Sequence, residues 1–517
     1  MSAVAGTPFF YLYDFHIQGM KTMLTILSCF LAALLTHGQQ YTLTEGCREA
    51  QDLISSLRFE QAREVLNEER QKDPSNLFPV ALDGYIDFLV VVIDEDRQVY
   101  DSLKGPYQEK IKIIQRGNRQ SPWYRSLLAR MNLQWAFAQL KFGGYLNAAL
   151  DISRAYHLLE DNAGLHPGFP PDQVGLGLLH ALIGSIPESY RWITGLFSME
   201  GSVEEGRKEL MQVLLTAGEE GFPGQREEAL FFLTYIDLNL QPDKERSLEL
   251  LPVFDNMDGE SLLLLFAKVR ILMQNARNDE AIELLVNRPA GKEYHPFYYL
   301  DYLAGQAKLN RLDPDANRYF LRYVTNFRGN SYVKAAYQKV AWYWLLQGEP
   351  DKYHDQMEKA LRYGDAITDA DRIAYSDALT GTVPDLCLLK ARLLFDGGYY
   401  QEADSTLKDA ACMPENKRDS LEWPYRMGRI LHASGNQAAA LEYYDRVIIE
   451  GAEEPYYFAA NAALQSGNIY ETMGEHDKAV TYYRKCLKLP NEEYRASLQQ
   501  KARAGLNRIR EKKKDAQ

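Results

Sequence analysis

The sequence predicts an all-α chain, an α-solenoid built from about nine to eleven helical hairpins, some of them irregular. Small and large apolar residues recur in a fixed order about every 34 residues, the length of a two-helix repeat. Ala, Leu and Glu, which favour helix, are frequent among the 517 residues. A solenoid grows by adding units, so a chain of this length does not need one large core.

The repeat is clearest in residues 460–490. Gly467 and Ala479 are small residues where the two helices of a hairpin would cross, and Tyr483 is a large residue beside them. Helices approach closely only where the side chains at the crossing are small. Pro490 closes the unit, since proline does not continue a helix. At nearly every position that defines the repeat, this segment resembles the tetratricopeptide-repeat (TPR) family. The resemblance implies stacked pairs of helices.

The same frame continues towards the N-terminus. Gly428 takes the place of Gly467 one unit earlier, and Ala403 takes the place of Ala479 in the unit before that. In the next unit Tyr353 replaces the usual small residue. Further units are expected at 260–290 and 294–328, around Ala50 and Ala62, and around Leu140, Gly144 and Ala149.

The rhythm of the repeat divides the chain into five parts. They are a leader at 1–38 with a signal peptide at 20–38, N-terminal TPR-like repeats at 39–163, irregular TPR-like repeats at 164–330, regular C-terminal repeats at 331–490, and a capping helix with a charged tail at 491–517.

Two stretches depart from the repeat. Phe88–Ile93 is an apolar run that resembles a strand, but its length and context predict a buried helix segment. Between residues 164 and 202, Pro and Gly residues must break helices. We expect a loop there, then a short tight helix, a break at Pro187, and an amphipathic helix through Trp192 and Phe197.

The N-terminal residues have the features of a secretory signal peptide. Lys21 supplies positive charge, Met23–Leu35 is a 13-residue apolar run, and small residues precede a cut after Gly38. Translation is therefore expected to begin at Met20. The run is shorter than the about 20 apolar residues of a membrane-spanning helix. Membrane contact is expected only through the cleaved leader or, as a less favoured alternative, through a lipid on Cys29.

The charge of the chain argues against a nucleic-acid partner. The formal net charge is −13, and an acidic protein without a basic patch repels a polyanion. The one dense basic run, Arg510–Lys514, has acidic neighbours and is interpreted as a solvated helix end.

Sequence motifs for catalysis or metal binding are absent. There is no P-loop, no H-E-x-x-H and no nucleophile elbow. His157, His166 and His180 are nine and fourteen residues apart, spacings that fit no common ligand pair. Four Cys after removal of the leader do not make a disulfide framework in so long a chain, and at least two are expected on packed helix faces. We therefore expect no catalytic residue, no cofactor and no metal ion.

The TPR resemblance also implies where a partner would bind. In that family the first helix of each unit lines a concave groove, and a few positions of that helix contact the partner. Carried over, these positions give the groove residues Trp342, Arg392, Tyr425, Arg429, His432 and Asn468. Trp, Tyr and Arg are the residue types that dominate binding energy at interfaces. Burial of the apolar ones between neighbouring units stays open as an alternative.

The predicted function is a non-catalytic TPR scaffold that binds a protein or peptide partner in the bacterial periplasm or at the cell surface. The alternative is a glycan-binding outer-membrane receptor component on a TPR base, suggested by the 34 Tyr residues, since sugars stack on exposed rings. An enzyme with its site in 164–202 is the least favoured hypothesis.

Overall fold

The chain is the all-α solenoid of helical hairpins that the sequence predicts. Its computed structural model describes residues 39–186, 198–217, 223–257, 260–409, 412, 414 and 416–515. Within these ranges the regular elements are helices, apart from one isolated bridge between Gln40 and Asn76. No helix in this part of the chain is long and apolar enough to span a bilayer.

The predicted leader lies outside the described residues. The signal peptide at 20–38, the start at Met20, the cut after Gly38 and the alternative lipid on Cys29 therefore stay predictions.

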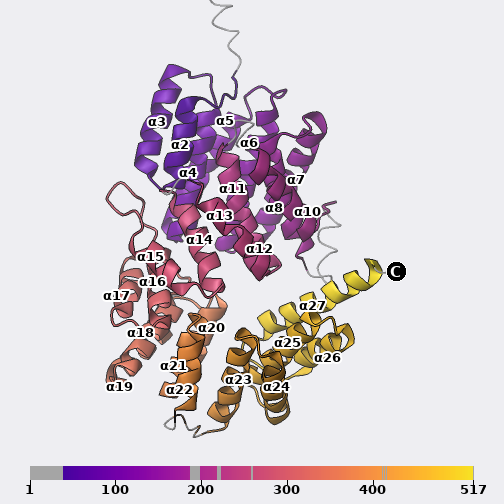
Figure 1. Cartoon of the computed structure of the whole chain (residues 1–517). Helices are drawn as coiled ribbons and strands as arrows, with labels where there is room; N and C mark the ends of the chain where they lie inside the picture. The colour runs from indigo at the N-terminus through magenta and orange to yellow at the C-terminus, as the bar shows by residue number, and fades with distance from the viewer. Residues whose placement is uncertain are drawn as a thin grey trace, which may run out of the picture. The chain divides into compact units, whose positions relative to one another are not determined.

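The described helices group into two compact units, coloured from indigo to yellow along the chain in Figure 1. The first unit ends at Phe232 and leaves out Ile93–Arg97, which belong to the second. The first contains α2 (Glu45–Ser55), α3 (Phe59–Lys72), α4 (Phe78–Asp94), α5 (Arg97–Ile114), α6 (Pro122–Lys141), α7 (Tyr145–Leu165), α8 (Pro170–Gly184), α10 (Val203–Thr216) and α11 (Pro223–Tyr235), with the last residues of α4 and α11 and the first residue of α5 assigned to the second unit.

The second unit begins with short elements and continues as longer helices. They are a π-helix η2 (Ile236–Leu240), α12 (Lys244–Glu249), α13 (Leu251–Phe254), α14 (Leu262–Gln274), α15 (Asn278–Val286), α16 (Tyr299–Asn310), α17 (Ala316–Asn326), α18 (Val333–Leu346), α19 (Pro350–Arg362), α20 (Asp369–Thr380), α21 (Leu386–Asp396), α22 (Tyr400–Lys408), α23 (Lys417–Ala433), α24 (Gln437–Glu450), α25 (Tyr457–Thr472), α26 (His476–Lys488) and α27 (Arg495–Asp515).

Consecutive helices of the second unit pack as hairpins: α18 with α19, α21 with α22, α23 with α24, and α25 with α26. The first helix of each hairpin also contacts the first helix of the next, from α18 through α21 and α23 to α25. These repeated contacts between first helices place their side chains on one continuous surface. An additional helix, α20, packs on α18 and α19 between two hairpins, and the repeat frame does not predict it.

Small residues lie where the two helices of a hairpin touch, as the repeat frame predicts. A Cβ atom on Gly467 would lie 2.6 Å from the Tyr483 ring, and a Cβ atom on Gly428 would lie 2.7 Å from the Tyr444 ring. Both distances are shorter than van der Waals contact allows, so only glycine fits without movement. The alanines that the frame places at crossings are fully buried; they are Ala403, Ala440 and Ala479.

In the first unit the repeat pattern predicts the buried small residue correctly at one hairpin and misplaces it by one residue at another. Ala50 is fully buried in α2, as predicted. Near α7, however, the fully buried residue is Ala148 and not Ala149, and Leu140 is 36% exposed. Because α7 begins at Tyr145, the side of the helix that faces α6 carries Ala148. The repeat pattern predicted Ala149 at this place, one residue further along the chain.

The two irregular stretches differ in outcome. Phe88–Ile93 lies inside α4, and Val91 is fully buried, so the predicted helix segment is confirmed. In 164–202, α8 is a 15-residue helix, longer than the short helix expected. Its first residues are Pro170 and Pro171, where the missing N–H of proline costs no helical hydrogen bond. The expected break at Pro187 and the helix through Trp192 and Phe197 lie outside the described residues.

Replacing Gly467 by Ala tests whether the crossings need small residues. The added methyl group overlaps the Tyr483 ring, so we expect the free energy of unfolding of the second unit to fall by about 1–3 kcal/mol, the usual cost of overpacking. Gly164 in α7 is the matched control, because it is exposed and an added Cβ there would have no neighbour within 4 Å. Gly164→Ala should instead stabilise the first unit by about 0.5–1 kcal/mol. Denaturant unfolding followed by circular dichroism measures both, and two changes of the same sign would contradict the assignment.

Candidate functional site

The six residues predicted to contact a partner lie on three neighbouring first helices and on a fourth beside them. Trp342 is on α18, Arg392 on α21, Tyr425, Arg429 and His432 on α23, and Asn468 on α25. Trp342 is in contact with Arg392, and Tyr425 is in contact with Arg429, whereas His432 and Asn468 are engaged elsewhere.

Three cations on neighbouring first helices lie against aromatic rings, and we name Lys339, Arg392 and Arg429 the cation row. Lys339 Nζ lies 3.7 Å from the ring centroid of Trp342, and Arg392 Cζ lies 4.9 Å from the same centroid. Arg429 Cζ lies 4.7 Å from the ring centroid of Phe395, which belongs to α21. These are cation–π contacts, which hold a charged group close to an apolar surface.

The cation row has almost no carboxylate partners among the described residues. Arg392 reaches only Asp396, at 3.9 Å, and the other two cations have no Asp or Glu oxygen within 4.0 Å. The neighbouring Arg426 is different: it forms an ion pair with Glu422 at 2.7 Å. The row therefore combines partial burial and aromatic support with few close ion pairs, while Asp371, Asp377 and Asp396 interact with Lys339 only from beyond 4.0 Å.

The charge of the row affects the titration of the groups around it. Burial and then the charge of Arg392 lower the pKa of Lys339 to about 7. Burial and then the charge of Arg429 lower the pKa of His432 to about 4. Like charges in a poorly solvated site disfavour a further proton, which gives both shifts their direction. A carboxylate entering this site would reduce that repulsion.

The aromatic members of the predicted set support the row from below its surface. Trp342 and Tyr425 are only 4% and 1% exposed, so the alternative of burial applies to both. Tyr425 still takes part, because its hydroxyl accepts a hydrogen bond from Arg429 Nη1 at 2.9 Å. Lys339 was not among the residues predicted from the sequence. The available signal was its position three residues before Trp342, which puts the two side chains on the same side of α18.

His432 and Asn468 are engaged by the second helices of their own hairpins. The Tyr444 hydroxyl lies 3.5 Å from His432 Nδ1, and the Tyr483 hydroxyl donates to Asn468 Oδ1 at 2.8 Å. Both tyrosines are the large residues packed on the crossing glycines. These two polar groups thus satisfy the tyrosine hydroxyls inside each hairpin.

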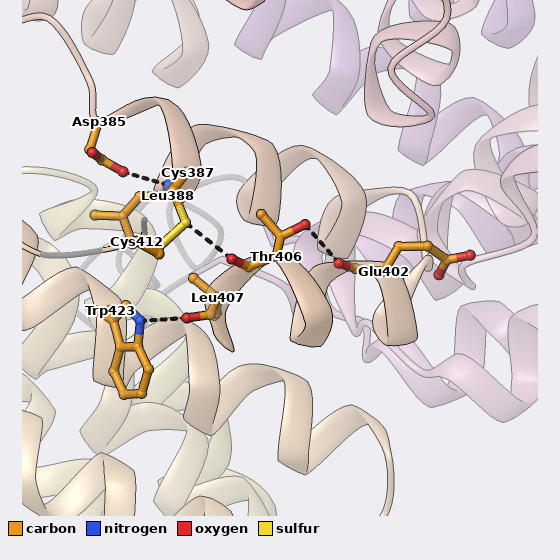
Figure 2. Close-up of a disulfide and its surroundings, with 8 residues drawn as sticks. All are labelled: Asp385, Cys387, Leu388, Glu402, Thr406, Leu407, Cys412 and Trp423. Atoms are coloured by element: carbon orange, nitrogen blue, oxygen red, sulfur yellow. Dashed lines mark hydrogen bonds between the residues drawn. A yellow bond between two sulfur atoms is a disulfide. The ribbon is translucent and has the colours of Figure 1, made fainter. Parts of the chain in front are cut away.

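A disulfide holds the start of α21, the central helix of the row. Cys387 in the first turn of α21 is bonded to Cys412, which follows α22, with the two Cα atoms 5.5 Å apart (Figure 2). The expectation of no disulfide framework is therefore corrected to a single bridge, formed because the hairpin brings together two Cys residues 25 positions apart. Cys47 and Cys486 are free and buried, as predicted for Cys on packed helix faces.

Two hydrogen bonds beside the disulfide fix the same hairpin (Figure 2). Asp385 caps α21 by accepting a hydrogen bond from the backbone N–H of Leu388 at 2.8 Å. Trp423 Nε1 of α23 donates to the carbonyl oxygen of Leu407 in α22 at 3.0 Å. α21 is thus tied at its beginning and through its partner helix, so Arg392 is carried on a well-anchored element.

The fold defines a helical-repeat protein. Residues 460–493, which contain α25 and α26, match the family model described as "Tetratricopeptide repeat". The TPR resemblance drawn from the sequence is thereby confirmed for this hairpin, and the chain is an α-solenoid with a TPR-like segment.

The other comparisons add little. No curated protein matches the sequence of this chain. The solved structures similar to it include the human IFIT1 dimer with m7Gppp-AAAA, at 14% identity over 79% of this chain and 90% of that chain, with a TM-score of 0.28. They also include the APC/C hetero-tetramer Cut9-Hcn1, at 14% identity over 88% of this chain and 95% of that chain, with a TM-score of 0.21. Likeness at these scores carries no argument about the function of this chain.

The double variant Cys387→Ser/Cys412→Ser tests the contribution of the disulfide. Loss of the covalent link enlarges the unfolded ensemble, so we expect the free energy of unfolding of the second unit to fall by about 3 kcal/mol. Denaturant unfolding with and without a thiol reductant measures this. Reductant should destabilise the wild-type protein to the same extent and leave the double variant unchanged. A wild-type protein that is insensitive to reductant would contradict the assignment.

Proposed function

We propose that this chain is a non-catalytic scaffold that binds a protein or peptide partner bearing carboxylates on the cation row, in the bacterial periplasm or at the cell surface. The observation that carries the proposal is the set of three partly buried cations that lie on aromatic rings without matching carboxylates. A cation removed from water is costly unless it is paired. A site that keeps such cations is suited to a ligand that completes the pairs.

The chemistry of the row favours a carboxylate over other groups. Each Arg presents N–H donors in a planar fork that matches the two oxygens of a carboxylate, and charge-assisted hydrogen bonds of this kind are strong. Trp342 and Phe395 hold the cations in place, which reduces the side-chain entropy lost on binding.

The spacing of the row suits an extended segment. Packed helices lie about 8–10 Å apart, and the row steps from α18 to α21 to α23, each in contact with the next. A polyproline II segment rises about 3.1 Å per residue and has three residues per turn, so every third side chain lies on the same side. Carboxylates three residues apart, about 9 Å, therefore match cations on successive first helices.

Two features support the proposed location of the protein. The predicted signal peptide at 20–38 favours export. The Cys387–Cys412 disulfide is consistent with it, because such bonds persist in oxidising compartments such as the periplasm and are rare in the cytosol.

The rival functions have less support. A glycan site needs ring faces open to solvent, but Trp342 and Tyr425 are buried, and Trp342 is in contact with two cations. A lysine with a lowered pKa can serve as a catalytic base. Here, however, the Lys339 ammonium is covered by Trp342 and donates to Gln338 Oε1 at 3.1 Å, which suits binding better than proton transfer.

Peptide binding to the exported form tests the proposal. A labelled extended peptide with Glu at every third position is compared with the same peptide carrying Gln, using fluorescence anisotropy. We expect the Glu peptide to bind at least about tenfold more tightly, because each charge-assisted pair contributes about 1.5–3 kcal/mol. Arg392→Gln/Arg429→Gln should remove this difference.

Arg484→Gln is the control, because Arg484 is an exposed Arg on the second helix α26, outside the row. It should leave the affinity unchanged. Equal affinity for the two peptides, or equal losses in the row variant and the control, would count against the proposal. A maltooligosaccharide or a single-stranded oligonucleotide that binds more tightly than the Glu peptide would favour another class of ligand.

Export is tested separately by mass spectrometry of the protein recovered from its native cell. We expect a mature N-terminus at Gln39 and a Cys387–Cys412 cross-linked peptide in a non-reducing digest. An N-terminus at Met1 together with reduced cysteines would contradict export. A lipid on Cys29 would move the proposal to an outer-membrane anchor.

A further inference from the structure

We infer that His180, Glu205 and Glu209 form a binding site for a divalent transition-metal ion between α8 and α10 in the first unit. One ligand atom from each of the three residues lies within 4.8 Å of the corresponding atoms of the other two. Imidazole nitrogen combined with carboxylate oxygens is a donor set that suits zinc and its first-row neighbours.

The two helices are held close together by glycines at their crossing. A Cβ atom on Gly206 of α10 would lie 2.1 Å from the carbonyl oxygen of Gly177 of α8, and a Cβ atom on Gly201 would lie 2.5 Å from the Cα atom of His180. No larger residue fits at these places without moving the backbone. The crossing therefore fixes the distance between the helix that carries the imidazole and the helix that carries the carboxylates.

The two carboxylates come from one side of α10. Glu205 and Glu209 are four residues apart, the spacing that puts two side chains next to each other on a helix. Glu209 is already held on the imidazole of His180, so only Glu205 has to be ordered when an ion binds. A partly preformed set of donors lowers the conformational entropy lost on binding.

A hydrogen bond alone explains only part of this arrangement. His180 is buried, and its Nδ1 lies 2.8 Å from Glu209 Oε2, which is an ordinary His–Glu contact. Glu205 is not needed for that contact, and among the described residues its carboxylate has no Lys or Arg nitrogen within 4.0 Å; it interacts electrostatically with His180. Two carboxylates close together repel each other, and a divalent cation between them would convert repulsion into binding.

The geometry needs little adjustment to hold an ion. Donor atoms about 2.0–2.2 Å from one zinc ion lie at most about 4.4 Å apart. Glu205 is exposed and can rotate to close the remaining gap. Water would complete the coordination on that exposed side.

The other group of metal-ligating side chains does not compete with this one. Asp385, Cys387 and Cys412 also lie close together, but both sulfur atoms are joined in the disulfide. The spacing of His residues along the sequence could not reveal the His180 site, because its other ligands are glutamates from the next helix.

Isothermal titration of the metal-stripped full chain with zinc chloride tests the inference. We expect one zinc ion per chain and a rise in the melting temperature of the first unit, since a ligand that binds the folded state stabilises it. Glu205→Gln removes a carboxylate that is exposed and not bonded to His180, so the variant should fold normally. It should weaken zinc binding more than about tenfold, since even an outer-shell partner contributes that much.

Glu204→Gln is the matched control, because Glu204 is the exposed neighbour on the same helix and lies outside the three ligands. It should bind zinc as the wild-type protein does. The inference is overturned if zinc binds equally well to Glu205→Gln, if Glu204→Gln weakens binding as much, or if the wild-type protein shows no saturable site.

Discussion

The close crossing of paired helices is the constraint on which the rest of the structure depends. At Gly467 and Gly428 the space that a side chain would need is filled by the rings of Tyr483 and Tyr444. Dispersion falls steeply with distance, so a packed ring in direct contact with backbone contributes far more than one separated by a gap. Because each hairpin closes in this way, first helices follow one another in contact, and their side chains share one surface.

The surface formed by the first helices explains why three partly buried cations lie close to one another. Lys339, Arg392 and Arg429 each belong to a different first helix, and only the stacking of hairpins brings them together. Partial burial without carboxylates destabilises the folded chain, and the aromatic contacts and the disulfide at α21 offset this. Functional sites commonly sacrifice stability in this manner. The crossing of α8 and α10 in the first unit positions side chains in a similar way, because glycines there set the distance between a His and two Glu residues.

The sequence predicted the parts of the structure that depend on local spacing. The recurrence of small residues identified the hairpins, their crossings at Gly428 and Gly467, and the helices on which the candidate residues lie. The recurrence of small residues does not show which side of a first helix is exposed to solvent. Trp342 was therefore predicted to line the groove, although its ring is buried beneath Lys339 and Arg392. Lys339 was missed because a single Lys on a helix has no pattern of its own.

Contacts between distant segments could not be predicted from the sequence, because they do not depend on local spacing. The Cys387–Cys412 pair and the convergence of His180 with Glu205 both require a turn whose geometry the sequence does not specify. The frame at α7 was one residue out because the helix start, and not the repeat, decides whether Ala148 or Ala149 is buried. Helix α20 lies between two hairpins without the small-residue signature, so periodicity had no means of finding it.

The pKa of Lys339 is the most direct measure of whether the helices pack as closely as the crossings require. NMR titration of isotopically labelled lysine side chains gives this value, with the signal assigned by its loss in Lys339→Met. With the ammonium held 3.7 Å from the Trp342 ring centroid and repelled by Arg392, we expect a pKa of about 7. A pKa near the ordinary value of 10.5 would mean a solvated ammonium on a loosely packed surface, and would contradict a row of cations held together by the stacking of hairpins.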